Sequence, residues 1–453
     1  MTMHHPSTVP ATGKLPCPGP EGSREAWLDY LFYLHDQRID LGLDRMRDMV
    51  ARLGIDFSGR TVVTVGGTNG KGSTVTMLES IYRHAGYKTG LHTSPHLIDF
   101  AERCVVAGRP VDDKTLVDAF MRVEKARDGL SLSFFEYTLL AFFLIFMDAE
   151  CEVVILEVGL GGRLDATNVI DSDAAVVVTV GIDHVGFLGS TREAIGAEKA
   201  PIYRPGRPAV CTDPEPPQSL VDYVEKIGAS PSYYLKDFRP VVHEDGTWDY
   251  EGPAGAFKNL PAPALKGRNQ YQNASGVLTV VERLMDRVPV SEEAVREGLV
   301  SVRLPGRFEE RRFMGADFIL DVGHNPHAAR VLFENLEDER RRGVHLIALC
   351  GMLKDKDRFG VLEILKDSFD DWVFTDLPTE RGGLAADLYA FAVKAGIPEE
   401  RRFEYHDFDA ALEKAVTLGK QILSEGRAGT VKIVVFGSFV TVELASRRFL
   451  AAA

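Results

Sequence analysis

The stretch Thr61–Thr74, TVVTVGGTNGKGST, has the residue types of a phosphate-binding loop between a strand and a helix. Its glycines allow backbone N–H groups to converge on an anion, and the following helix N-terminus adds the positive end of a dipole. Lys71 and the hydroxyl of Ser73 suit the β/γ-phosphates and a Mg²⁺ ion. The strict G-x-x-x-x-G-K-[ST] pattern is not met, because Val65 replaces the first glycine and Gly72 follows Lys71. A glycine-rich turn with a solvated lysine is the alternative, but the order strand, loop, helix favours a phosphate cradle.

Two later apolar runs end in polar residues that could join the cradle. Glu157 lies at the end of the run 153–158, and His184 follows the run 174–180. Because parallel strands present their carboxyl ends at one edge of a sheet, we expect both side chains beside the cradle, where a P-loop protein holds Mg²⁺. Taken singly, a strand-end glutamate is more often an ordinary edge residue, and a lone histidine a hydrogen-bonded core residue. Lys199, near the end of a predicted helix, would by itself be a solvated lysine.

The composition describes a globular protein of more than one domain. At 453 residues the chain exceeds what one hydrophobic core usually supports, and 45% of the residues are apolar. The net charge of −14 argues against nucleic acid or an anionic membrane as a partner. Five scattered cysteines without a C-x-x-C pair predict a reduced, cytoplasmic protein and neither a disulfide framework nor a zinc site. The longest apolar run, 139–147, is too short to span a bilayer.

Hydrophobic periodicity divides the chain into three parts. Residues 1–22 are rich in proline, glycine and serine and predict a disordered leader. Residues 23–301 begin with helical patterns and continue with alternating strands and helices around the cradle, and residues 302–453 resume the alternation after Leu304-Pro305-Gly306. This order predicts an α/β protein, with a P-loop NTPase-like, mostly parallel sheet domain followed by a smaller Rossmann-like α/β domain.

Ten motifs follow one another along residues 24–445: GGTNGKGST, TSPHL, SFFEYT, LEVGLGGRLDATN, GIDH, EKAPIYR, PGRFE, DVGHNPHAA, GMLKDKD and GSFVTV. Together they resemble the folylpolyglutamate synthases and dihydrofolate synthases, which are ATP-dependent amide ligases akin to the Mur ligases of cell-wall synthesis. The joint pattern is specific to that family, whereas the cradle alone indicates only a nucleotide.

The resemblance implies positions for ATP and metal. The ATP-binding positions are the cradle, an asparagine that meets adenine, a linker arginine and a ribose-side carboxylate: Thr68, Asn69, Gly70, Lys71, Gly72, Ser73, Thr74, Asn273, Arg307 and Asp321. The metal ligands are Ser73, Glu157, His184 and Lys199, the last as a carbamate, because an ammonium group cannot bind Mg²⁺. The catalytic positions are Lys71, Lys199 and His324. The implied cofactors are ATP, two Mg²⁺ ions and a monovalent cation.

The resemblance also implies a pterin pocket, at Ser133, Phe135, Asp165 and Ala166. An aromatic face and a carboxylate suit a flat, donor-rich pterin ring. Without the family, Phe135 would be assigned to the core. Asn269 stands where many relatives have histidine, and Pro201 where glycine is common. Neither departure removes a phosphate-binding or metal-binding group.

The implied reaction adds L-glutamate to dihydropteroate, to a reduced folate, or to both, through an acyl phosphate. Three rivals are a Mur-type ligase acting on a UDP-sugar peptide, a P-loop NTPase switch that forms no bond, and a catalytically inactive folate-binding module. The SFFEYT and DATN segments argue against the first, the second βα domain against the second, and the complete set of cradle and metal residues against the third. We expect small-molecule substrates as the only partners and a monomeric protein.

Overall fold

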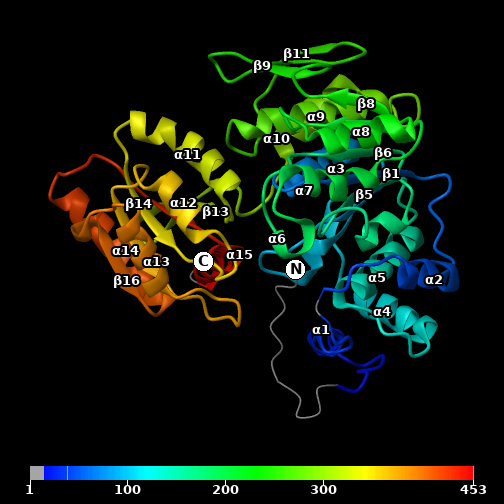
Figure 1. Cartoon of the computed structure of the whole chain (residues 1–453), viewed down its shortest axis with the longest axis horizontal. Coiled ribbons are helices and arrows are strands. Elements are labelled where there is room, and N and C mark those ends of the chain that lie inside the picture. Colours follow the sequence, from blue (N-terminus) through cyan, green and yellow to red (C-terminus); the bar gives the residue numbers. More distant parts are fainter. Residues whose placement is uncertain (1–14, 38, 452–453) are drawn as a thin grey trace. The chain divides into compact units, whose positions relative to one another are not determined.

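The strand that enters the cradle is β1 (Thr61–Gly66), and it lies inside a large sheet of the first of two units (Figure 1). The structure is a computed structural model that describes residues 15–37 and 39–451. The first unit extends to Ala264 and resumes with Tyr271–Arg303, and the second comprises Leu265–Gln270 and the chain from Leu304 onward. The predicted leader lies outside the described residues as far as position 14, and residues 15–22 form no helix or strand.

The first unit is built on an eight-stranded sheet in the order β4-β3-β2-β5-β1-β6-β7-β8. Neighbouring strands from β2 to β8 are parallel, whereas β3 and β4 are antiparallel additions at one edge. Because β1 lies between β5 and β6, the segments that follow these three strands share one edge of the sheet. The bounds are β2 (Thr89–His92), β3 (Cys104–Val106), β4 (Arg109–Pro110), β5 (Val153–Glu157), β6 (Ala174–Val177), β7 (Pro208–Cys211) and β8 (Ser230–Tyr233).

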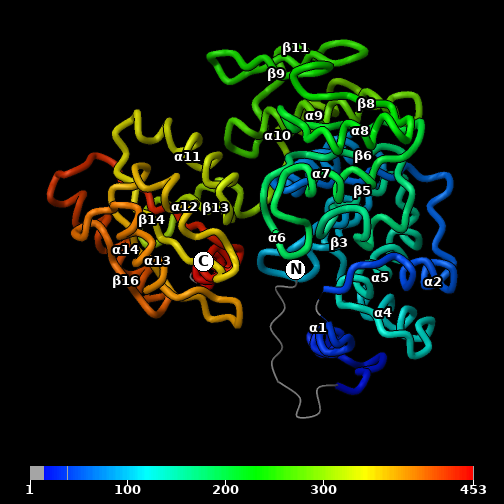
Figure 2. Tube along the Cα trace, viewed as in Figure 1, coloured from blue at the N-terminus to red at the C-terminus, as the bar shows by residue number. Residues whose placement is uncertain are grey.

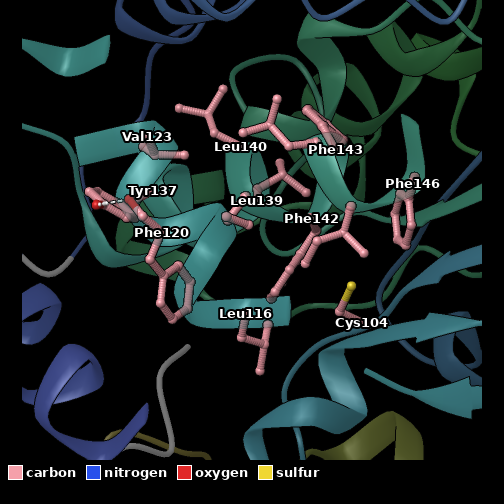
Figure 3. Close-up of a cluster of buried hydrophobic side chains, with 14 of the residues drawn as sticks. Cys104, Leu116, Phe120, Val123, Tyr137, Leu139, Leu140, Phe142, Phe143 and Phe146 are labelled. Atoms are coloured by element: carbon pink, nitrogen blue, oxygen red, sulfur yellow. Dashed lines mark hydrogen bonds between the residues drawn. The ribbon is translucent and has the colours of Figure 1, made fainter. Parts of the chain in front are cut away.

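The core of the first unit is richest around two helices that pack against each other, α4 and α5 (Figure 3). Ser133 caps α5, whose apolar residues are buried almost throughout, and the hydroxyl of Tyr137 donates to the carbonyl of Phe120 at 2.7 Å. The helices that begin before Leu304 are α1 (Arg24–Phe32), α2 (Asp44–Leu53), α3 (Lys71–His84), α4 (Asp113–Arg127), α5 (Phe134–Asp148), α6 (Val185–Leu188), α7 (Arg192–Lys199), α8 (Gln218–Ile227), α9 (Asn269–Arg283) and α10 (Glu292–Ser301).

A three-stranded antiparallel sheet lies apart from the large sheet, beyond α9 in the view of Figure 2. Its strands are β9 (Arg239–Val242), β10 (Trp248–Glu251) and β11 (Ala256–Leu260). Trp248 and Tyr250 of β10 are fully buried, and the Tyr250 hydroxyl donates to the Glu282 carboxylate of α9 at 2.6 Å. This small sheet is therefore fixed to α9 by one face of its central strand.

The second unit is built on a six-stranded sheet in the order β12-β13-β17-β14-β15-β16. All its strand pairs are parallel except the β12–β13 pair. Its core contains Trp372, Phe374 and Phe436, with the rings of Phe369 and Phe436 stacked at 5.4 Å. The bounds are β12 (Glu309–Phe313), β13 (Ala316–Asp321), α11 (Pro326–Arg341), β14 (His345–Cys350), α12 (Arg358–Leu365), β15 (Asp371–Thr375), α13 (Ala385–Lys394), β16 (Arg402–Tyr405), α14 (Phe408–Ser424), β17 (Val431–Phe436) and α15 (Phe439–Ala451).

The eight-stranded and six-stranded sheets are mixed and dominated by parallel pairs, which confirms the predicted α/β class. Within the part of the chain that the structure describes, no helix is both long and apolar enough to cross a membrane.

Candidate active site

The predicted cradle is a loop between β1 and α3, and α3 begins directly at Lys71. Gly67 and Gly70 have φ of 137° and 91°, a backbone region that side chains disfavour. A Cβ atom on Gly67 would also lie 2.9 Å from the backbone nitrogen of Val178, on the loop after β6. Glycine is therefore required at Gly67 by backbone conformation and by close approach of a second loop.

The loop after β6 is hydrogen-bonded to the cradle. The backbone nitrogen of Thr68 donates to the Thr179 carbonyl at 2.6 Å, and that of Asn69 to the Thr179 hydroxyl at 3.2 Å. The Thr68 hydroxyl donates to the Gly181 carbonyl at 3.1 Å. These contacts explain why β6 ends at Val177, before the predicted position 180: the backbone that follows pairs with the cradle instead of with a strand.

Two lysine side chains meet at one carbonyl oxygen of the cradle. Lys71 Nζ donates to the carbonyls of Gly67 at 3.0 Å and Thr68 at 3.1 Å, and Lys199 Nζ donates to the Gly67 carbonyl at 2.9 Å. Lys199 ends α7 and is only 3% exposed, so it is not the solvated lysine that its position alone would indicate. Burial and the nearby Lys71 charge lower the pKa of Lys199 to about 7, against the opposing effect of Asp183 and Asp165.

The lowered pKa of Lys199 predicts how stability depends on pH. The unfolded chain binds a proton at this lysine up to a pKa near 10.5, and the folded chain only up to about 7, so the free energy of unfolding should rise with pH between these values. We expect Lys199→Met to be more stable than the wild type at pH 7, with the difference shrinking by up to about 1.4 kcal/mol per pH unit toward pH 10. Urea denaturation in CO₂-free buffer measures this, and a difference independent of pH would contradict it.

The predicted metal residues lie at the same edge of the sheet. Glu157 ends β5 opposite Val65 of β1, and its Oε2 accepts from the hydroxyl of Thr93 and from the backbone nitrogen of Ser94, the latter at 3.0 Å. Ser73 lies in the first turn of α3. His184 has a left-handed backbone, with φ of 51°, and its Nε2 is 4.0 Å from Asp183 Oδ2.

Among the described residues, no three His, Cys, Asp or Glu side chains form a group that could hold a metal ion alone. Mg²⁺ is commonly bound by one or two carboxylates, with nucleotide phosphates and water as the other ligands. The arrangement is therefore suited to a metal that arrives with a nucleotide and not to a permanent protein cage.

The remaining residues predicted for ATP fall into two groups. In the first unit, the Thr74 hydroxyl donates to the Gly70 carbonyl at 3.0 Å, and a Cβ atom on Gly70 would lie 2.9 Å from Asn273 Oδ1, so Asn273 contacts the cradle directly. Gly72 is buried in the first turn of α3.

In the second unit, Arg307 precedes β12, Asp321 ends β13, and His324 follows that strand. Asp321 accepts from the backbone nitrogens of Phe308 at 3.0 Å and Gly323 at 2.8 Å, and burial raises its pKa against the opposing effect of Arg307. The Arg307 guanidinium lies 5.2 Å from the ring centroid of Phe439, and the His324 ring 6.3 Å from it. His324 Nδ1 is 2.9 Å from the Val322 carbonyl.

The residues predicted for the pterin lie around the start of α5 and the loop after β5. Ser133 caps α5 and exchanges hydrogen bonds with Glu136, whose Oε1 is 3.0 Å from a guanidinium nitrogen of Arg45. Phe135 is partly buried, and a Cβ atom on Gly159 would lie 2.9 Å from its ring.

The predicted pterin residues Asp165 and Ala166 have clear structural roles. Asp165 Oδ2 accepts from the backbone nitrogen of Leu160 at 2.8 Å, and Oδ1 from the nitrogen and hydroxyl of Thr167 at 3.0 and 2.7 Å. Burial raises the pKa of Asp165 against the effect of these hydrogen bonds. Ala166 begins the short helix Ala166–Val169 that Asp165 caps. Both oxygens of this carboxylate are thus already engaged within its own loop.

Two family models match the chain, one described as the Mur ligase middle domain over residues 65–210 and one as the Mur ligase, glutamate ligase domain over residues 306–437. The dihydrofolate synthase/folylpolyglutamate synthase of Escherichia coli (strain K12) is 41% identical over 363 residues, which are 80% of this chain and 84% of that protein. The chain belongs to the folylpolyglutamate synthase/dihydrofolate synthase family.

Solved structures from this family have the same fold. E. coli FolC in complex with DHPP and ADP has a TM-score of 0.88 at 36% identity, covering 96% of this chain and 99% of that one. A bifunctional folylpolyglutamate synthase/dihydrofolate synthase with Mn, AMPPNP and L-glutamate bound has a TM-score of 0.84 at 34% identity, with the same coverage.

Sequence reasoning gave no role to several residues that hold the site of this family member together. Thr93 and Ser94 bind the Glu157 carboxylate, and Thr179 binds the cradle backbone. Arg45 connects α2 to Glu136 at the start of α5. The position of the TSPHL segment directly after a strand is the one signal that could have indicated Thr93 and Ser94, because polar loops at the carboxyl edge of a parallel sheet commonly line a site.

Proposed function

We propose that this chain is an ATP-dependent amide ligase that adds L-glutamate to dihydropteroate and to reduced folates. The observation that carries the proposal is the arrangement around Gly67, whose carbonyl accepts from Lys71 and Lys199 next to the strand that ends in Glu157. The Lys71 ammonium and a carboxylate at a glycine-rich loop suit a triphosphate and its metal. Relatives solved with ADP, AMPPNP, Mn and L-glutamate support these ligands here.

A carboxylate does not condense with an amine in water, because its oxygen is a poor leaving group. In the proposed reaction the substrate carboxylate attacks the γ-phosphorus of ATP and ADP leaves, which gives an acyl phosphate. The amine of glutamate then adds to the acyl carbon, and inorganic phosphate leaves as the amide forms. Lys71, at the mouth of α3, is placed to neutralise charge on the transferring phosphoryl oxygens. His324 of the second unit is our candidate for a group that assists the incoming amine.

The donor set at the sheet edge fits Mg²⁺. Glu157 offers a carboxylate oriented by two hydrogen bonds, and Ser73 and His184 offer a hydroxyl and an imidazole. When bound, Mg²⁺ would supply charge neutralisation at the phosphate oxygens. Lys199 can join the set only if its neutral amine adds CO₂ and releases a proton to give a carbamate, and its pKa near 7 provides that neutral amine. A second Mg²⁺ and a monovalent cation complete the proposed cofactors.

The substrate assignment follows the pocket and the family. We assign ATP and pterin binding to the domain 23–301 and the glutamate-ligase role to the domain 302–453, with Arg307 and Asp321 as its ATP-side residues. Phe135 supplies an aromatic face near Asp165, which suits a pterin ring. We place the enzyme in the cytoplasm as a monomer that uses only small-molecule substrates, and these statements stay predictions.

Product analysis tests the function. The pure protein is incubated with ATP, Mg²⁺ and L-glutamate together with dihydropteroate, tetrahydrofolate or a UDP-sugar peptide. We expect ADP, phosphate and a glutamylated product in equal amounts with each of the first two acceptors. An amide formed only on the UDP-sugar peptide would indicate a Mur-type ligase, and ATP hydrolysis that ignores glutamate and yields no amide would indicate a nucleotide-dependent switch.

A further inference from the structure

His92 is a buried histidine that the proposed mechanism does not use. It is the last residue of β2 and is 1% exposed. Its imidazole contacts two phenylalanine rings of α5, with centroid distances of 5.6 Å to Phe135 and 5.5 Å to Phe142. A polar ring in this position needs an explanation, because an apolar side chain would fill the same space without burying nitrogen atoms.

The hydrogen bonds of His92 fix its tautomer. Nδ1 is 2.9 Å from the carbonyl oxygen of Arg103, and since a carbonyl can only accept, Nδ1 carries the hydrogen. Burial and the nearby Arg103 charge lower the pKa of His92 to about 3, so the ring is neutral at physiological pH. Nε2 therefore carries a lone pair and can only accept, and it has no hydrogen-bond partner among the described residues.

The two phenylalanine rings beside His92 differ in burial. Phe142 is fully buried in the core cluster, whereas Phe135 is only partly buried. A Cβ atom on Gly159 would lie 2.9 Å from the Phe135 ring and 3.3 Å from Asp165 Oδ2, so the Phe135 ring is a neighbour both of His92 and of the Asp165 loop. The Phe135 side of His92 is thus the side of the proposed pterin pocket.

A pterin ring presents several N–H donors, and two polar groups assigned to its pocket already make hydrogen bonds within the protein. The Asp165 carboxylate accepts three hydrogen bonds from Leu160 and Thr167. Ser133 is engaged with the Glu136 carboxylate at 2.9 Å. An additional neutral acceptor would satisfy a donor on the ring without adding a charge to the buried pocket.

We propose that His92 Nε2 accepts a hydrogen bond from an N–H group of the pterin ring when the Phe135 side chain makes room for the substrate. His92 is then a substrate-binding residue, and it favours substrates whose pterin ring has an N–H group at this position. This proposal rests on the proposed function, because it needs a pterin substrate. Ligand binding would pair a buried acceptor that has no partner among the described residues of the free protein.

Two substitutions separate the two ring nitrogens. In His92→Asn the amide nitrogen can take the place of Nδ1 and donate to the Arg103 carbonyl, while nothing replaces Nε2. In His92→Gln the longer side chain can place its amide oxygen at the position of Nε2. We expect His92→Asn to raise KM for dihydropteroate about five- to tenfold, the effect of one neutral hydrogen bond, with KM for ATP and glutamate unchanged. His92→Gln should recover most of this loss.

Tyr82 provides a matched control. Its hydroxyl is also buried without a partner among the described residues, but it lies late in α3 and the mechanism gives it no role. Tyr82→Phe should leave every KM unchanged. Thermal unfolding of each variant, together with equilibrium binding of dihydropteroate, separates folding effects from binding effects.

The outcomes divide clearly. If the wild type is active and His92→Asn has the same KM for dihydropteroate as the wild type, the proposed role of Nε2 is wrong. Equal losses in His92→Asn and His92→Gln, or parallel rises in KM for ATP, would also overturn it by indicating a packing role. A wild type that ligates no pterin substrate would instead overturn the proposed function, and this inference with it.

Discussion

Lys71→Ala should reduce ligation by about 10²–10³-fold or more while the protein stays folded. The lysine is the first residue of α3, and its Nζ donates to the carbonyls of Gly67 and Thr68 in its own loop. Alanine is the best helix former, so the start of α3 should persist. The lost ammonium leaves the charge that develops on the transferring phosphoryl group without its neighbour in the cradle. Steady-state kinetics with circular dichroism checks both parts of this expectation.

The same variant has a second signature. Lys71 helps to lower the pKa of Lys199, so the loss of the Lys71 ammonium should raise the pKa of Lys199. The rise in the free energy of unfolding with pH should then begin at a higher pH than in the wild type. Lys226→Ala is the matched control, since this lysine is exposed on α8. A folded Lys71→Ala protein with wild-type activity would exclude the proposed role of the cradle.

Glu157→Gln should be the next most damaging change, with an expected fall in kcat of about 10²–10³-fold and a higher requirement for Mg²⁺. Glutamine keeps the shape of the side chain, and its amide oxygen can accept the hydrogen bonds from Thr93 and Ser94 that the carboxylate Oε2 accepts now. The substitution therefore removes the charge and leaves the local packing. Initial rates measured over a range of Mg²⁺ concentrations report the change.

A glutamate at the other end of the same strand gives the control for this charge. Glu152 precedes β5 and binds the backbone nitrogen of Lys88 at 2.9 Å, at the edge of the sheet away from the cradle. Glu152→Gln should leave the Mg²⁺ dependence unchanged. If Glu157→Gln and Glu152→Gln gave the same Mg²⁺ dependence as the wild type, Glu157 would not be a metal ligand.

The elements that position the site could be predicted because their signals are local. β5 comes from the apolar run 153–158, and its end in the structure differs from the end of that run by one residue. β7 (Pro208–Cys211) is not predicted by the sequence, because it is short and lies in a proline-rich segment. The sheet of β9, β10 and β11 is not predicted for a related reason: its strands have four or five residues, and only β10 alternates between buried and less buried positions.

The residue types of the site could be predicted, but its contacts could not. Lys199 and Gly67 are 132 positions apart, and no spacing rule indicates that Lys199 shares the Gly67 carbonyl with Lys71. The same holds for His92, which the sequence alone predicts to be an ordinary strand residue. The structure adds its unpaired Nε2 and its contact with the Phe135 ring. Such contacts depend on which strands become neighbours, and that is decided by the whole fold.

Transfer of an oxygen label tests the central claim, that this site forms an acyl phosphate, most directly. Dihydropteroate labelled with ¹⁸O in both carboxylate oxygens is incubated with the protein, ATP, Mg²⁺ and L-glutamate, and the phosphate and the product are analysed by mass spectrometry. The account predicts one ¹⁸O atom in each phosphate released and one retained in each amide product. Phosphate without ¹⁸O, or label found in AMP, would contradict it.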